Sequence, residues 1–127
     1  MLEKNSKIIN FTFQKNICSK LSDKYSFEIM GNKYLLMYSG MKPYYNRPVI
    51  EIGDYEFFNR KIVSIIKNWK RKYPPTLGYE NEEMWTLDIR FLNRKKAIHY
   101  EGHIGLTRNC YDLEKFLENY FAKTRSL

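Results

Sequence analysis

Apolar residues occupy every second position of segment 85–91, and polar residues fill the positions between them. A period of two is typical of a β-strand that buries one face and exposes the other. The polar segment 93–95 then reverses the chain, and 96–101 returns with the same alternation. This stretch predicts a β-hairpin, and the elements on either side of it carry apolar stripes that pack against such a sheet.

Four stretches in the first half of the chain also have strand patterns: 7–14, 25–30, 33–39 and 49–52. We expect a loop over 16–24, where the apolar alternation stops. Gly31 and Asn32 form a two-residue connection, and a glycine in the first place favours a turn with positive φ. Because 33–39 is apolar on both faces, we expect it to be the central strand, covered on two sides. The strand over 49–52 then ends a four-strand meander.

Two segments show the three-and-four spacing of an amphipathic helix. The first is predicted over 55–72, with Asp54 as its N-cap and the prolines at 74–75 beyond its end. The second begins at Asn109, another good capping residue. Its predicted buried stripe consists of Leu113, Phe116, Leu117, Tyr120 and Phe121.

The predicted element order is ββββ–α–ββ–α. It indicates the α+β class, with an antiparallel sheet of about six strands packed against two amphipathic helices. We expect a single domain over 1–127, with loose ends at 1–6 and 123–127. No apolar run approaches the roughly 20 residues that cross a bilayer, and no signal peptide is expected. Cys18 and Cys110 lack metal or redox spacing, so we expect reduced thiols in a cytoplasmic protein.

The chain carries a formal net charge of +8 at pH 7. Six cations and no acid lie between positions 60 and 72. This excess favours an anionic partner such as nucleic acid, an acidic protein or anionic lipid. Two alternatives stay open. The cations form a solvated face that serves solubility, or they pair with the acidic loop 79–83 of the same molecule.

A second candidate surface is the proline-bounded segment 43–48. It displays tyrosine and arginine, which stack on bases or anchor protein interfaces. The alternative is a stiff turn whose tyrosines lie at the edge of the core. The predicted binding residues of the two surfaces are Tyr44, Tyr45, Arg47, Arg60, Lys67, Lys70 and Arg71.

The sequence has no P-loop, dinucleotide-binding or nucleophile-elbow motif. His99 and His103 straddle a strand end, where a spacing of four does not bring two zinc ligands together with Cys110. A Cys110–His103–Asp112 triad has no oxyanion-hole motif, although a position in a helix first turn would lower the pKa of Cys110. We therefore expect no enzyme activity, no metal and no cofactor. A small metal-independent ribonuclease using His99 or His103 stays open as a third alternative.

Four motifs carry a resemblance: W-K-R-K-Y at 69–73, W-T-L-D-I-R-F at 85–91, Y-E-G at 100–102 and N-C-Y-D-L-E-K-F-L at 109–117. Over 57–121 the chain resembles small, largely uncharacterised bacterial proteins in which a helix ending in Trp precedes a W-x-L-x-I hairpin and an Asn-capped helix. It departs from them between Gly102 and Asn109, where they have a Pro-containing, Ser/Asn-rich loop. The resemblance implies an accessory role in biological conflict, of the immunity or anti-defence type, and brings no catalytic residues.

The leading functional hypothesis is a non-catalytic binding protein that neutralises another macromolecule by steric occlusion. Its partner would be a protein effector, such as a nuclease or a nucleoprotein complex. A composition rich in Lys, Ile, Asn and Tyr and poor in Ala is typical of A+T-rich bacterial or phage genes. The alternative is a module that binds single-stranded RNA or DNA, with cations on phosphates and tyrosines stacked on bases. No membrane partner is expected, and the oligomeric state stays open.

Overall fold

The computed structural model describes residues 6–17, 20–40, 48–73, 83–103 and 109–125. Its elements follow the order ββββ–α–ββ–α, so the predicted α+β class and element order are confirmed. They are β1 (Ile8–Ile17), β2 (Lys20–Met30), β3 (Lys33–Gly40), β4 (Val49–Glu51), α1 (Tyr55–Ile66), β5 (Glu83–Phe91), β6 (Ile98–His103) and α2 (Asn109–Arg125).

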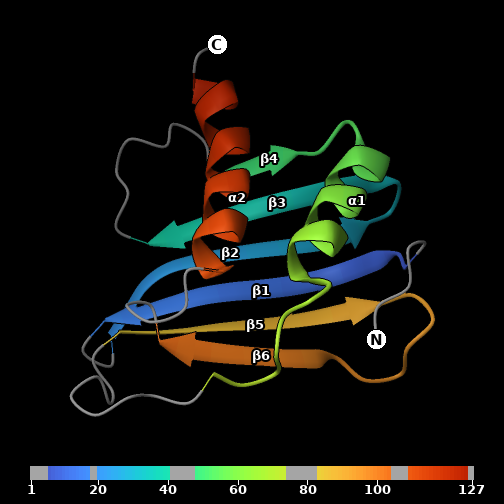
Figure 1. Cartoon of the computed structure of the whole chain (residues 1–127). Coiled ribbons are helices and arrows are strands. Elements are labelled where there is room, and N and C mark those ends of the chain that lie inside the picture. Colours follow the sequence, from blue (N-terminus) through green and yellow to red (C-terminus); the bar gives the residue numbers. More distant parts are fainter. Residues whose placement is uncertain (1–5, 18–19, 41–47, 74–82, 104–108, 126–127) are drawn as a thin grey trace.

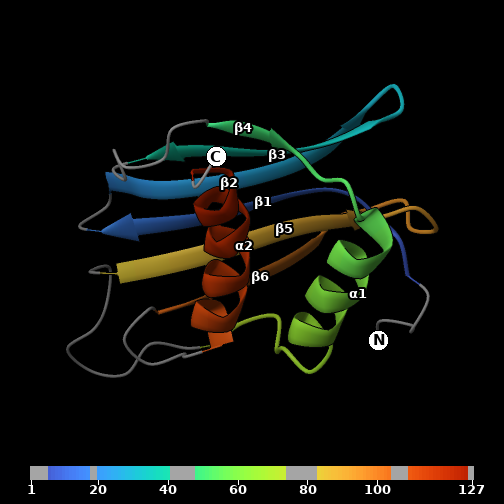
Figure 2. The same ribbon diagram turned by 90° about the horizontal axis from the view of Figure 1, so that it is seen from above.

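The six strands form one antiparallel sheet in the order β4-β3-β2-β1-β5-β6 (Figure 1). The first four strands make the predicted meander, and the β5–β6 hairpin joins the sheet along β1. Both helices lie on the same side of the sheet (Figure 2). The sheet therefore has a covered face, under the helices, and an open face on the other side. In the described part of the chain, neither helix is long and apolar enough to span a membrane.

Alternation along the strands sends apolar side chains to the covered face. Phe11 and Phe13 of β1 are 2% and 0% exposed, so Thr12 between them points to the open face. Trp85 and Leu87 of β5 are buried in the same way, as the period of two predicts. Full burial of such a side chain contributes about 1.5–3 kcal/mol to stability before entropy is subtracted.

Phe58 of α1 joins the three parts of the core. Its ring centroid lies 5.0 Å from that of Phe27 on β2, and 5.8 Å and 5.3 Å from those of Phe116 and Tyr120 on α2. Asp54 caps α1 as predicted, because its carboxylate accepts a hydrogen bond from the Phe57 backbone N–H at 3.2 Å. One buried residue thus ties both helices to the sheet.

The β5–β6 hairpin depends on a glycine opposite a tryptophan. Trp85 and Gly102 are register partners, and the indole ring lies over the glycine. A Cβ atom on Gly102 would come within 2.9 Å of two ring atoms of Trp85. The glycine of the Y-E-G motif is therefore a packing requirement of the hairpin. At the β2–β3 turn, Gly31 has a φ of +65°, which confirms the predicted positive φ.

The predicted loop over 16–24 is wrong, because β1 continues to Ile17 and β2 begins at Lys20. Polar residues take core-facing positions here, each with a partner. The Lys15 Nζ lies 2.8 Å from Glu114 Oε2 of α2, and the Tyr38 hydroxyl donates to the Asp23 carboxylate. Buried polar groups with hydrogen-bond partners do not interrupt a strand. They interrupt only the apolar pattern by which a strand is recognised.

The strand predicted to be central is β3, and the structure places it second from the edge, beside β4. Its open-face residue Met37 is only partly buried, and it lies opposite the exposed Val49 of β4. The apolar residues on the open face of β3 therefore contact the neighbouring strand β4. They are not covered by a second layer of structure.

Helix α1 ends at Ile66, so its predicted extent over 55–72 is wrong. After a turn, in which the Trp69 N–H donates to the Ile66 carbonyl, the chain runs along the edge of β6. We call residues 69–73 the strap. The Glu101 N–H donates to the Arg71 carbonyl, and the Tyr73 N–H donates to the Glu101 carbonyl, both at 3.0 Å.

Trp69 explains why the helix prediction ran too far. Its ring packs edge-on against Trp85 and Tyr100, with centroids 5.1 Å and 5.7 Å away. Trp69 comes three positions after Ile66, and a residue at that spacing can reach the core from a turn as well as from a helix. The spacing of apolar residues therefore does not distinguish a turn from a longer helix. At the other end of the chain, α2 continues to Arg125, so it includes residues 123–125 of the predicted loose end.

Candidate binding surface

Four of the seven predicted binding residues lie in the described part of the chain, and the other three do not. The described four are Arg60, Lys67, Lys70 and Arg71. Tyr44, Tyr45 and Arg47 lie outside the described residues. The candidate surface is therefore built here from α1 and the strap alone.

Arg60 and Lys67 lie on one side of α1, away from the core. They are seven residues apart, or about 10 Å along the axis, and both are exposed. Lys61 lies next to them, and its ammonium group sits 5.8 Å from the centroid of the Phe57 ring. The helix itself is held against the sheet by Phe58, so these cations project from a rigid support.

The strap splits the predicted basic row into two parts. The Arg71 guanidinium lies 5.8 Å from the Tyr100 ring centroid, and the Tyr73 and Trp85 centroids are 6.1 Å apart. Lys70 and Lys72, on either side of Arg71, are exposed. The prediction that Arg71 continues the helical row of Arg60 and Lys67 is wrong.

We call the six cations of α1, its C-cap Lys67 and the strap the basic surface: Arg60, Lys61, Lys67, Lys70, Arg71 and Lys72. All six are exposed. None of them forms an ion pair with another residue that the structure describes. An ion pair lies at the N-terminal end of α1, away from these cations. There Lys7, the residue before β1, has its Nζ 4.0 Å from Glu56 Oε1. The predicted pairing with the acidic loop 79–83 stays a prediction, because Glu80 and Glu82 lie outside the described residues.

His99 lies on the open face between two carboxylates. Its Nδ1 is 2.7 Å from Asp88 Oδ1 on β5, and its Nε2 is 3.0 Å from Glu101 Oε1. The hydrogen bond to Asp88 is the main reason why the pKa of His99 is raised; burial opposes this shift, and the hydrogen bond to Glu101 adds to it. The imidazolium form satisfies both carboxylates because each ring nitrogen then carries a proton.

The arrangement of His99 bears on the metal and ribonuclease alternatives. The two carboxylates bind opposite edges of the ring, so they do not converge on one ion with it. Among the described residues, no group of three or more His, Cys, Asp or Glu side chains has the arrangement of a metal site. In-line cleavage of a phosphodiester needs its attacking and leaving oxygens on opposite sides of phosphorus. His99 and Glu101 are hydrogen-bonded to each other, so this pair does not offer a separated acid and base. The ribonuclease alternative stays a prediction.

Cys110 lies in the first turn of α2 and is fully buried. Burial, with a further contribution from the Glu114 carboxylate, raises the pKa of Cys110 to about 12. The predicted lowering of its pKa by the helix first turn is therefore wrong. A thiol that stays protonated inside the core is a poor nucleophile and a poor metal ligand.

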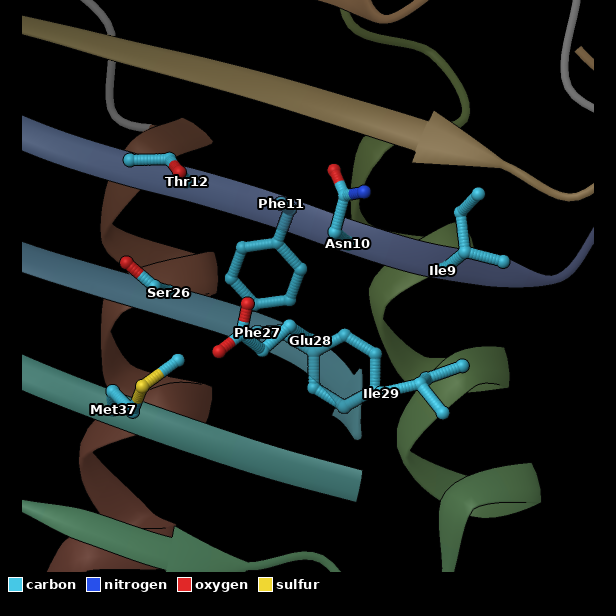
Figure 3. A pocket seen from close by; sticks show the side chains of 9 residues that line it. All are labelled: Ile9, Asn10, Phe11, Thr12, Ser26, Phe27, Glu28, Ile29 and Met37. Carbon is cyan, nitrogen blue, oxygen red and sulfur yellow. The ribbon is translucent and has the colours of Figure 1, made fainter. Parts of the chain in front are cut away.

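A hollow on the open face was not predicted from the sequence. It has a volume of about 410 Å³ and lies over β1, β2 and β3 (Figure 3). Asn10, Thr12, Ser26, Glu28 and Met37 are among the residues that line it. The alternation of strands marks most of these positions as outward-facing. Their convergence depends on the pairing register, which the sequence does not reveal.

No protein-family model, curated protein or solved structure matches this chain. The resemblance to bacterial conflict-system proteins therefore stays a prediction.

Proposed function

We propose that this protein is a non-catalytic binding protein that neutralises another macromolecule by steric occlusion, and that the basic surface makes the contact. One observation carries the proposal. Six exposed cations stand on α1 and the strap without an ion pair to any described residue. Like charges held close together repel one another, and an anionic partner relieves that repulsion.

The support beneath these cations favours binding over a purely solubilising role. α1 is anchored by fully buried Phe58, Ile62 and Ile66. The strap is held by two backbone hydrogen bonds to Glu101 and by the packing of Trp69. A backbone that is already held in place loses less conformational entropy on binding, so a given set of contacts produces tighter binding.

The proposed partner is an acidic surface of a protein effector, such as a nuclease or a nucleoprotein complex. Complementary charge speeds encounter and selects the partner, while the body of the inhibitor blocks access to the covered surface. An immunity or anti-defence role fits this mode of action, because occlusion needs a stable shape and no catalytic group.

The test is a charge-reversal variant, Arg60→Glu with Lys67→Glu and Lys70→Glu. Arg71 is left in place because its guanidinium packs on Tyr100, and reversing it would disturb the strap. Wild type should recover one protein from a lysate of its host in stoichiometric amounts. The triple variant should lose that partner, with affinity reduced at least about 100-fold, because each reversed charge now faces a like charge.

The matched control reverses three exposed lysines elsewhere, Lys33, Lys96 and Lys115, and so changes the net charge equally. It should keep the partner. Equal loss in both variants would mean that net charge and not the basic surface drives binding, and recovery of nucleic acid alone would overturn the proposal.

The same uncompensated cations also support a second candidate, binding to the phosphates of a nucleic acid. The described exposed aromatic residues, Phe57 and Tyr111, are 39% and 44% exposed, so base stacking would depend mainly on other residues. Affinity measured against salt separates the two candidates. Phosphate contacts on a single strand produce a log–log slope of about −0.7 for each phosphate. A contact with an acidic protein surface is also screened by salt, but its slope should be smaller, because a protein lacks the condensed counterion layer of a nucleic acid.

A further inference from the structure

Four polar side chains on the open face converge on the hollow, and none of them has a partner among the described residues. Asn10 and Thr12 come from β1, and Ser26 and Glu28 come from β2 (Figure 3). They form two register pairs, Asn10 with Glu28 and Thr12 with Ser26. No side-chain hydrogen bond or ion pair joins any of the four to another described residue. Their polar atoms are therefore available to a ligand.

Side-chain length explains why the sheet is hollowed at this place. Thr12 and Ser26 have short side chains, and longer ones stand two positions away on each strand. Those longer neighbours are Asn10, Gln14, Lys24 and Glu28. Met37, the register partner of Ser26 on β3, adds an apolar wall. The volume of about 410 Å³ falls within the range of small-ligand sites, roughly 300–1,000 Å³.

The hollow carries a charge opposite to that of the whole protein. Among the described residues that line it, Glu28 alone is charged, with Lys24 at the rim two positions before Ser26, while the chain has a net charge of +8. A carboxylate beside two hydroxyl groups and an amide oxygen offers several hydrogen-bond acceptors. Guanidinium has five donors in a planar fork that pairs with a carboxylate through two parallel bonds. Met37 is placed to pack against the methylene groups of an arginine stem.

We propose that this hollow binds an arginine side chain of a partner protein, with Glu28 as the group that pairs with the guanidinium. It lies on the face opposite the helices, so the inference is independent of the basic surface. A protein with both sites contacts a cationic surface through its sheet and an anionic surface through α1 and the strap.

The test is a titration of the ¹⁵N-labelled protein, followed by NMR, with Nα-acetyl-arginine methylamide as the probe. Saturable shifts are expected at the amides of Thr12, Ser26 and Glu28, with a dissociation constant on the order of millimolar for so small a ligand. The citrulline analogue has nearly the same shape without the charge. It should bind at least about tenfold more weakly, because a charge-assisted hydrogen bond is lost.

Variants test the role of Glu28 itself. Glu28→Gln should abolish the shifts, while Glu51→Gln should leave them unchanged, because Glu51 is an exposed acid of β4 that does not line the hollow. Arg90, the register partner of Asn10 on β5, is a cation on the same face. Arg90→Gln should tighten binding by about twofold, because a like charge is removed nearby.

Three outcomes would overturn the inference: equal binding of the citrulline probe, shifts that map elsewhere, or unchanged binding to Glu28→Gln. Glu28 is exposed, and a well-dispersed spectrum of the variant shows that its fold is intact. Failure of this titration leaves the capture experiment on the basic surface unaffected, and failure of that experiment leaves this titration unaffected.

Discussion

The same strands build both faces of the sheet, and the two faces differ in almost every other property. The covered face holds a continuous group of aromatic rings and two helices. The open face carries short polar side chains, charged residues and a hollow. Consecutive residues of one strand therefore have different tasks. One set holds the fold together, and the other is free to serve contacts with little cost to stability.

The sharpest test of this division substitutes two neighbours on β5. Trp85 is fully buried, while Thr86 points to the open face. We expect Trp85→Ala to lower the free energy of unfolding by about 3–5 kcal/mol, through lost burial and the cavity left behind. Thr86→Ala should cost less than about 1 kcal/mol. Urea unfolding followed by far-UV circular dichroism measures both. Similar losses would show that the open face is part of the stabilising core.

A smaller effect is expected where the hairpin has no room for a methyl group. Gly102→Ala places a Cβ within 2.9 Å of the Trp85 ring and should cost about 1–3 kcal/mol through overpacking. Gly53→Ala is the matched control, since a Cβ there meets no atom within 4 Å. It should be neutral or slightly stabilising. Thermal melts of the two variants provide the comparison, and equal shifts would mean that backbone freedom and not the indole ring explains Gly102.

The smallest effect concerns His99 on the open face. Its pKa in the folded state is raised by Asp88 and then by Glu101. Its contribution is therefore fully present below the unfolded value of about 6.5 and is lost as pH rises through the folded value. The side chain is 47% exposed, so the stabilisation should stay below about 1 kcal/mol.

The measurement for His99 is the difference in unfolding free energy between wild type and His99→Gln. Wild type should be more stable near about pH 5.5, and the advantage should shrink by about pH 8.5. An advantage that grows with pH would show that neutral and not protonated His99 is the stabilising form. A difference as large as that for Trp85 would contradict the division between the two faces.

The pattern of the sequence was sufficient for the fold wherever apolar residues marked the covered face. The hairpin at 85–101 and the stripe of α2 show this. The apolar pattern did not predict the strands over 16–24, because Lys15 and Asp23 occupy core-facing positions there and have polar partners. The pattern also predicted helix wrongly at 67–72. Trp69 reaches the core from a turn, but it stands at a spacing from Ile66 that a helix would also have.

The candidate surfaces were harder to predict than the fold. The exposed cations of α1 follow from their spacing, but the position of Arg71 over Tyr100 depends on where the helix ends. The hollow depends on the register that sets Thr12 opposite Ser26. Hydroxyl and amide residues are common on exposed strands, so their types alone did not mark a site. Long-range pairing is the information that was missing.

The strap has a consequence for behaviour at high concentration. A bare edge strand presents unpaired N–H and C=O groups that recruit strands from other molecules. At one edge of this sheet, β4 is only three residues long, and at the other the strap occupies both backbone groups of Glu101. Trp69 and Arg71 hold this cover in place through Tyr100. We expect that loosening them would expose the edge of β6 to pairing between molecules and so raise the tendency to aggregate.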